Sequence, residues 1–306
     1  MLVIVNPRSA GGRVARRWTA LEATLRDALG DFELRHTEAP GHATAICREA
    51  IERGTRDLLV LGGDGTLSEA VSGFFRDGRP VDAGASLGLL PYGTGGDFRR
   101  TIELPADLGQ AARLIARARP RPIDVGRLRY TRDDGTSAER YFANIASFGI
   151  GGLVDRIVNR GSKALGGRLS FLVGTVRALA QYRNQRVRLG LDEGEPSEVV
   201  VSNVAVCNGR YFGGGMKVAP DARIDDGLFD VVVIGDVGLK DFITSGRRLY
   251  RGTHLELDHV QWARAGRVRA EPARPGDEVL IDVDGEQSGR LPATFDILPG
   301  ALPFRC

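Results

Sequence analysis

The sequence predicts an α/β protein, with an N-terminal three-layer α/β domain containing a mostly parallel sheet and a C-terminal antiparallel β-sandwich domain. In the first 120 residues, short apolar runs alternate with helical periodicity, as in a parallel sheet covered by helices. Beyond Pro120-Arg121-Pro122, most segments alternate in twos between turn residues, as in antiparallel sheets. A length of 306 residues suits two cores, because one domain usually holds about 100 to 200 residues.

The N-terminal domain is expected over residues 1–122, and Leu2–Val5 is its first buried strand. The other strands expected there are Phe32–Arg35, Leu58–Leu61 and Leu87–Leu90. Helices are expected near Arg13–Leu29, His42–Arg53, Leu67–Phe75 and Ala106–Ala118. Such alternation predicts parallel strands whose carboxyl ends lie at one edge of the sheet.

The C-terminal domain is expected over residues 123–293, with two helical insertions near Leu165–Tyr182 and Leu239–Tyr250. Its clearest strands are Asp124–Tyr130, Arg140–Ile145, Glu198–Val206, Gly227–Ile234 and Glu278–Val283. Residues 294–306 form a tail that can return to the N-terminal domain, and Thr294–Leu298 suits a last strand of either domain.

Composition excludes several classes of protein. Charged residues make up 26% with both signs interspersed, so the net charge of +3 does not indicate a nucleic-acid partner. The three cysteines are far apart and odd in number, which favours a reducing cytoplasm over a disulfide framework. No apolar run reaches the roughly 18 residues of a spanning helix, so any membrane contact is expected to be peripheral.

Three glycine-rich loops follow the first, third and fourth predicted strands. They are Asn6–Arg13, Gly62–Thr66 and Pro91–Phe98, and Asp64 and Asp97 lie within two of them. Glycine lets the backbone approach a ligand closely, so several N–H groups can point at phosphate oxygens where a helix begins. Any one loop alone indicates only a tight turn between strand and helix, but three on one edge predict a nucleotide site.

The Walker and Rossmann glycine spacings are both absent. Instead, the sequence resembles the lipid kinase superfamily typified by bacterial diacylglycerol kinases, with sphingosine and ceramide kinases as relatives. The resemblance runs over nearly the whole chain, although Gly96 stands where the family usually has Asn. The motifs that carry it are Asn6-Pro7, Gly63-Asp64-Gly65-Thr66 with Glu69, Pro91-Tyr92-Gly93-Thr94 with Asp97-Phe98, Asn208-Gly209, Gly213-Gly214-Gly215-Met216, Ala219-Pro220, Asp225-Asp226-Gly227-Leu228 and Asp284-Gly285-Glu286.

The resemblance implies the residues that contact ATP. They are Asn6, Thr37, Gly62, Gly63, Asp64, Gly65, Thr66, Leu67, Ser68, Glu69, Gly93 and Thr94. Thr37 ends the second predicted strand on the same sheet edge, although a turn hydroxyl bonded to its own backbone explains that residue equally well.

The catalytic candidates are acidic, because phosphoryl transfer needs Mg²⁺ and a group that accepts the proton of the attacking hydroxyl. The resemblance implies that Asp284 or Glu286 is this general base, and the sequence leaves both open. An Asp-Gly hairpin turn exposed to solvent is the plainer interpretation of the same residues. Asp64 is a third candidate, as a ligand of the Mg²⁺ that accompanies the nucleotide.

A structural Mg²⁺ is also implied by the resemblance, held by the Asp226 carboxylate and the backbone carbonyls of Arg223 and Leu228. Oxygen ligands suit this hard cation. The plainer interpretation is a polar turn before the strand at Val231–Ile234.

Basic amphipathic stretches lie near Leu165–Arg183 and Leu239–Arg251. We expect most of their apolar residues to pack in a core and some of their arginines to attract an anionic membrane. The expected protein is thus an ATP- and Mg²⁺-dependent kinase of diacylglycerol or a related lipid, cytoplasmic and peripheral on the inner membrane face. A homodimer is compatible with the resemblance. The alternatives are a kinase of a soluble acceptor such as NAD and a non-catalytic nucleotide sensor that docks on membranes.

Overall fold

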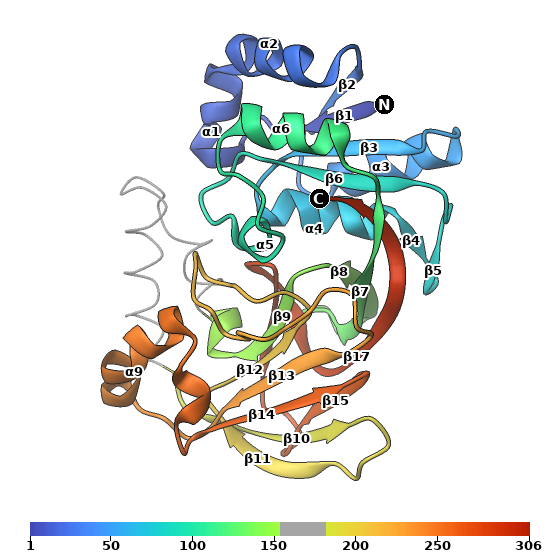
Figure 1. Cartoon of the computed structure of the whole chain (residues 1–306). Coiled ribbons are helices and arrows are strands. Elements are labelled where there is room, and N and C mark those ends of the chain that lie inside the picture. The colour runs from blue at the N-terminus through green and yellow to red at the C-terminus, as the bar shows by residue number, and fades with distance from the viewer. Residues whose placement is uncertain (154–181) are drawn as a thin grey trace.

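A computed structural model describes residues 1–153 and 182–306 of the chain (Figure 1). Its N-terminal sheet is parallel, in the order β6-β3-β1-β2, because each strand is followed by a helical crossover. The strands are β1 (Leu2–Val5), β2 (Glu33–His36), β3 (Asp57–Gly62) and β6 (Ser86–Pro91). Leu58 to Leu61 are fully buried, as expected for a strand covered on both faces.

Helices cover both faces of this sheet, so the three layers predicted from the sequence are confirmed. Helices α2 and α6 pack against each other on one face, and α3 and α4 pack against each other on the opposite face (Figure 1). The helices are α1 (Ser9–Arg16), α2 (Trp18–Leu29), α3 (His42–Glu52), α4 (Asp64–Gly73), α5 (Asp97–Thr101) and α6 (Leu108–Arg117). A short hairpin of β4 (Phe75–Arg76) and β5 (Arg79–Pro80) follows α4.

The single helix expected over Arg13–Leu29 is divided. Arg17 leaves helical geometry, with φ −114° and ψ 13°, and separates α1 from α2. Upstream, Ala10, Gly11 and Gly12 have positive φ, so the chain between β1 and α2 is a turn-rich segment rather than one continuous helix.

The C-terminal strands are antiparallel, as predicted. They are β7 (Arg121–Thr131), β8 (Ser137–Phe142), β9 (Ile145–Gly149), β10 (Gln185–Leu191), β11 (Ser197–Val201), β12 (Asn203–Cys207), β13 (Phe229–Ile234), β14 (Val260–Ala265), β15 (Arg267–Pro272), β16 (Leu280–Val283) and β17 (Glu286–Arg305). Helix α9 (Leu239–Arg251) and the 3₁₀ turn η2 (His254–Glu256) lie between β13 and β14.

Two segments expected as single strands are each divided. Arg140–Ile145 includes the end of β8, which pairs with β7, and the start of β9, which pairs with β12 and β16. Glu198–Val206 is likewise split at Ser202, because β11 pairs with β10 while β12 pairs with β9 and β13. The helix expected at Leu165–Tyr182 lies outside the described residues, apart from Tyr182.

The last strand, β17, connects the two parts of the molecule. It pairs antiparallel with β7 over most of its length, and its end pairs parallel with β6 through Phe304 and Arg305. Figure 1 shows this strand, in red, running from the C-terminal sheet to the N-terminal one. Phe304 packs edge-on against Phe98 of α5, with ring centroids 5.4 Å apart, so the return of the chain also fixes the helix that follows β6.

Candidate active site

The loops after β1 and β3 bond to each other at the carboxyl edge of the N-terminal sheet. The amide nitrogen Nδ2 of Asn6 donates to Oγ1 of Thr66 over 2.9 Å. The side-chain oxygen of Asn6 accepts from the backbone N–H of Arg8 over 2.9 Å. These bonds hold the first loop against the start of α4.

The loops after β3 and β6 also touch, and they do so through glycine. A Cβ added at Gly93 would lie 2.5 Å from Cα of Gly63, so only glycine at position 93 allows this approach. Gly63 begins α4 with no side-chain cap, which leaves the first-turn N–H groups of the helix available to an anion.

Asp64 and Asp97 form an acidic pair beside these loops. The Asp64 carboxylate accepts from the backbone N–H groups of Asp97 and Phe98, over 3.1 and 3.0 Å. Asp97 accepts from the N–H of Gly214 over 2.8 Å and from Arg100 over 3.0 Å. Burial, followed by the charge of Asp64, raises the pKa of Asp97 to about 6. The concentration of negative charge here suits a bound cation.

Asp284 occupies the turn of the hairpin between β16 and β17. Asp284 has φ 51° and Gly285 has φ 84°, which is the two-residue turn that Asp-Gly favours. The carboxylate is not solvated as in a plain turn, because Oδ1 accepts from the N–H of Ile145 over 3.0 Å. Burial raises the pKa of Asp284 to about 7, against the lowering effects of the Ile145 N–H and the Arg140 charge, while the charge of Asp64 raises it further.

Arg140 of β8 joins this hairpin to α4, the helix that follows the glycine-rich loop after β3. Its Nη2 lies 2.7 Å from Oε2 of Glu286 and donates to Oγ of Ser68 over 3.2 Å. Its Nη1 donates to Oγ of Ser288 over 3.0 Å. A Cβ added at Gly65 would lie 2.9 Å from Oε1 of Glu286, so the Glu286 carboxylate rests against the loop after β3. The predicted residues of the two distant motifs are therefore brought together.

Other predicted residues lie at the edge of this cluster or face away from it. Leu67 is 2% exposed, so its side chain belongs to the core. Glu69 faces α3, where its carboxylate accepts from the N–H of Ala43 over 3.2 Å, and burial raises its pKa. Thr37 directly follows β2, with its N–H bonded to the carbonyl of Val5, while Gly93 and Thr94 are exposed.

Arg140, Arg100 and Gly214 are site residues that the sequence analysis did not identify. Arg140 directly precedes the buried pair Tyr141 and Phe142, and an arginine at the end of an amphipathic strand is a weak signal by itself. Gly214 lies in one of the matched motifs, but its partner Asp97 is 117 residues away in the sequence. Such pairings depend on tertiary structure.

The predicted structural metal site lies elsewhere, before β13. Oδ1 of Asp226 accepts from the N–H of Leu228 over 3.2 Å, and Oδ2 is paired with the guanidinium of Arg264. Within residues 1–153 and 182–306, no group of three or more His, Cys, Asp and Glu side chains is arranged to hold a metal ion. A cation at Asp226 stays a prediction.

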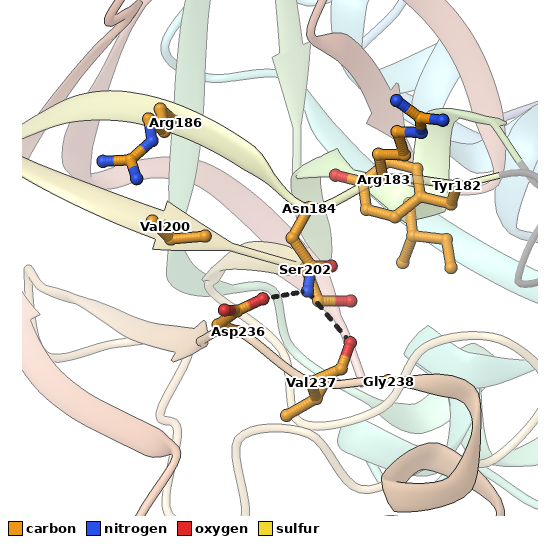
Figure 2. A pocket seen from close by; sticks show the side chains of 10 residues that line it. Tyr182, Arg183, Asn184, Arg186, Val200, Ser202, Asp236, Val237 and Gly238 are labelled. Atoms are coloured by element: carbon orange, nitrogen blue, oxygen red, sulfur yellow. Dashed lines mark hydrogen bonds between the residues drawn. The ribbon is translucent and has the colours of Figure 1, made fainter.

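A cavity of about 460 Å³ lies between β10, β11 and the segment that leads into α9 (Figure 2). Tyr182, Arg183 and Ser202 line it, and Asn184 bonds across it to Asp236 over 2.5 Å and to the carbonyl of Val237 over 3.0 Å. None of the predicted site residues lines this cavity, so it is separate from the carboxylate cluster.

Comparison with known proteins assigns the family. Residues 1–128 match the diacylglycerol kinase catalytic domain, and residues 144–305 match the YegS C-terminal NAD kinase beta sandwich-like domain. The chain belongs to the diacylglycerol kinase family. It is 30% identical to a diacylglycerol kinase of Mycobacterium tuberculosis over 85% of this chain and 80% of the relative.

Other members of the diacylglycerol kinase family resemble the chain over nearly its whole length. A diacylglycerol kinase of Bacillus subtilis is 28% identical, over 96% of this chain and 91% of the relative. The crystal structure of a candidate diacylglycerol kinase from Bacillus anthracis superposes with a TM-score of 0.76 at 28% identity, covering 99% of this chain and 94% of the other. Both the fold and the family expected from the sequence are thus confirmed.

Gly96, where the resemblance implies Asn, has φ 66°, a left-handed conformation that Asn also tolerates. Gly96 gives no side-chain cap to α5, and Asp64 supplies acceptors for the N–H groups of Asp97 and Phe98 instead.

In the described ranges, no helix has the length and hydropathy required to cross a bilayer.

Proposed function

We propose that this chain is an ATP- and Mg²⁺-dependent lipid kinase that transfers the γ-phosphate of ATP to a lipid hydroxyl, with diacylglycerol as the first acceptor to test. The observation that carries the proposal is the contact between the Asp284–Glu286 hairpin and the loop after β3, made through Arg140 and Ser68. It places carboxylates from the C-terminal part beside the anion-binding start of α4.

The nucleotide phosphates bind over the glycine-rich loops, where the first N–H groups of α4 lack a side-chain cap. Asn6 fixes the start of α4 through Thr66, and Asp64 fixes the start of α5. Asp64, with Asp97 beside it, holds the Mg²⁺ of MgATP, because this ion needs only one or two carboxylates in addition to phosphate oxygens. Mg²⁺ held by these carboxylates would supply positive charge that neutralises the transferred phosphoryl group.

Asp284 is the general base rather than Glu286. The Glu286 carboxylate is engaged by Arg140 over 2.7 Å, so its role is to hold that guanidinium between the hairpin and Ser68. The pKa of Asp284, about 7, is matched to proton transfer near neutral pH. Asp284 takes the proton of the lipid hydroxyl as the oxygen–phosphorus bond forms, while the bond from the γ-phosphorus to the bridging oxygen breaks and ADP leaves.

The lipid acceptor is reached from the membrane surface. Arg247, Arg248 and Arg251 are exposed on α9, where they can attract the anionic inner face of a cytoplasmic membrane. Leu249 of the same helix is buried, as expected of its apolar residues, whereas Tyr250 is 58% exposed and does not pack in a core. The stretch before Tyr182 lies outside the described residues. Contact with the membrane is peripheral in this proposal.

The test offers labelled ATP and Mg²⁺ with a panel of hydroxyl lipids in detergent micelles, and separately with NAD. Label in a lipid supports the proposal, and label in NAD alone would instead identify a soluble-acceptor kinase. Absence of label in every acceptor, with ATP binding retained, would identify a nucleotide sensor. Asp284→Asn should lower the rate of transfer by about 10²-fold or more. Asp277→Asn, which changes an exposed carboxylate on the approach to the same hairpin, serves as the matched control.

A further inference from the structure

The loop before β13 contains the place where the resemblance implies a structural cation, bound by the Asp226 carboxylate. In the structure, both oxygens of that carboxylate have donors within the protein. Oδ1 accepts from the N–H of Leu228 over 3.2 Å, and Oδ2 pairs with the guanidinium of Arg264. The Asp226 side chain is 18% exposed and the Arg264 side chain 39%, so the carboxylate is half-buried while the guanidinium remains open to solvent.

The position of Arg264 follows from strand register. Arg264 of β14 lies directly opposite Asp230 of β13. Nε of Arg264 is 3.9 Å from Oδ2 of Asp230, whose side chain is 2% exposed and also accepts from Nε1 of Trp262 over 2.7 Å. The guanidinium therefore lies between two carboxylates and links the loop to the sheet.

The neighbouring carboxylates have protein partners as well. Asp124 accepts from the N–H groups of Gly227 and Gly300, each over 2.7 Å. Asp225 lies 3.4 Å from Arg223 and 3.9 Å from Arg121. A divalent ion requires about six oxygen ligands, and one bound at Asp226 would have to displace the Arg264 guanidinium and then lie beside its positive charge.

We propose that in this chain Arg264 takes the place of the structural cation, so that Asp226 is neutralised from within the protein and the loop needs no divalent metal ion. The guanidinium supplies what the cation would supply, a positive charge that ties the Asp225–Leu228 loop to the edge of the C-terminal sheet. The proposal does not depend on which acceptor the enzyme phosphorylates.

Thermal unfolding of chelator-treated protein, titrated with MgCl₂ in the absence of nucleotide, tests this. The wild type and Asp226→Asn should show the same Mg²⁺-dependent shift in Tm, because any binding at the Asp64 cluster is common to both. Arg264→Gln should gain a further rise of about 2 °C or more at millimolar Mg²⁺, because the carboxylate is then free for a cation. That gain should vanish in the double variant with Asp226→Asn. Arg264→Lys, which keeps the charge, is the matched control and should gain nothing.

A larger Mg²⁺-dependent shift in the wild type than in Asp226→Asn would overturn the proposal, because the native site would then bind the ion despite Arg264. A folded Arg264→Gln that gains no Mg²⁺ response would overturn it too, since the loop would then lack affinity for the cation altogether. If Arg264→Gln does not fold, the comparison of the wild type with Asp226→Asn still decides, and Mn²⁺ binding followed by electron paramagnetic resonance repeats it without melting the protein.

Discussion

Two acidic regions of the molecule differ in how their charge is compensated. At the edge of the N-terminal sheet, burial and, to a smaller degree, the charge of Asp64 raise the pKa of both Asp97 and Asp284, although backbone N–H groups bind each carboxylate and Arg100 and Arg140 lie nearby. In the loop before β13, Asp225 and Asp226 each face an arginine within 3.4 Å. In the part of the chain that the structure describes, Asp64 has only backbone N–H donors, whereas Asp226 is paired with Arg264. Burial, with a smaller part from the charge of Asp226, still raises the pKa of Asp124 and Asp230 in the second region.

The difference separates a site that needs a ligand from one that is already complete. Concentrated carboxylates cost folding free energy unless a cation or a proton joins them, and such costs are typical of active sites. A carboxylate that is neutralised by a guanidinium, as Asp226 is by Arg264, has less need of a cation. The same residue type therefore points to chemistry in one place and to structure in the other.

Removal of the base in the first region should have the largest effect. Asp284→Asn should lower kcat by about 10²- to 10⁴-fold, because the amide cannot accept the proton of the hydroxyl. The Kd of ATP should change little, since the amide oxygen can still accept from the N–H of Ile145. Single-turnover assays with labelled ATP, together with equilibrium nucleotide binding, measure both quantities. Near-normal kcat would contradict the assignment of the base.

Arg140 should show the next largest effect, because it acts through Glu286 and Ser68. Arg140→Met and Glu286→Gln should each lower kcat. The loss in the double variant should be smaller than the sum of the two single losses, expressed as free energies. The expected coupling is about 0.5 to 3 kcal/mol. Arg129→Met, which breaks the ion pair between Arg129 of β7 and Asp296 of β17, is the matched control and should leave kcat nearly unchanged. Additive losses would mean that Arg140 and Glu286 act independently.

The pH dependence of kcat should reflect the raised pKa of Asp284. The base must be ionised, so the rate should fall about tenfold per unit as the pH drops below about 7. Bound Mg²⁺ favours the carboxylate and can move this acidic limb only downward, whereas Arg140→Met should move it upward by removing a nearby positive charge. If kcat did not change between about pH 5.5 and 8, a base with this pKa would be excluded.

Features dictated by local pattern could be predicted from the sequence. The strands β1, β3 and β6 are runs of apolar residues buried on both faces, and the Asp284-Gly285 turn follows from its residues. The edge strand β14 and its neighbour in sequence, β15, were missed because each carries few apolar side chains: β15 alternates, but only Val268 and Ala270 mark its buried face. The return of β17 to β6 could not be fixed, because an isolated strand does not reveal its partner.

Residues of the candidate site could be located from the sequence where a single motif contains them, and were missed where they are brought in by contacts between distant segments. Asp64, Asp284 and Glu286 lie in motifs and come together in the structure. Arg140 bonds to residues 72 and 146 positions away, so neither its sequence neighbours nor its strand reveals its role. The position of Arg264 likewise depends on Asp230, directly opposite on the neighbouring strand β13, and on Asp226 in the loop before that strand.

The stability of two Asp-to-Asn variants should separate the regions by the sign of the change, although the effects are small. The pKa of Asp97 in the folded state, about 6, lies above its ordinary value of 3.8. The folded state therefore binds the proton more tightly than the unfolded state does. The stability that the protonated carboxyl contributes is lost as the pH rises through about 6. Without Mg²⁺ at pH 7.5, Asp97→Asn should therefore raise Tm by about 2 °C, even though the bond to Arg100 weakens. A change of roughly 1 kcal/mol in the free energy of unfolding corresponds to such a shift in Tm. Asp226→Asn should lower Tm by a similar amount because Arg264 loses its charged partner. Melting curves from about pH 4.5 to 8 measure both, and the Asp97→Asn advantage should disappear below pH 5. If both variants were destabilised at pH 7.5, the charge of the carboxylates at the edge of the N-terminal sheet would be as well compensated as the charge of those in the loop before β13.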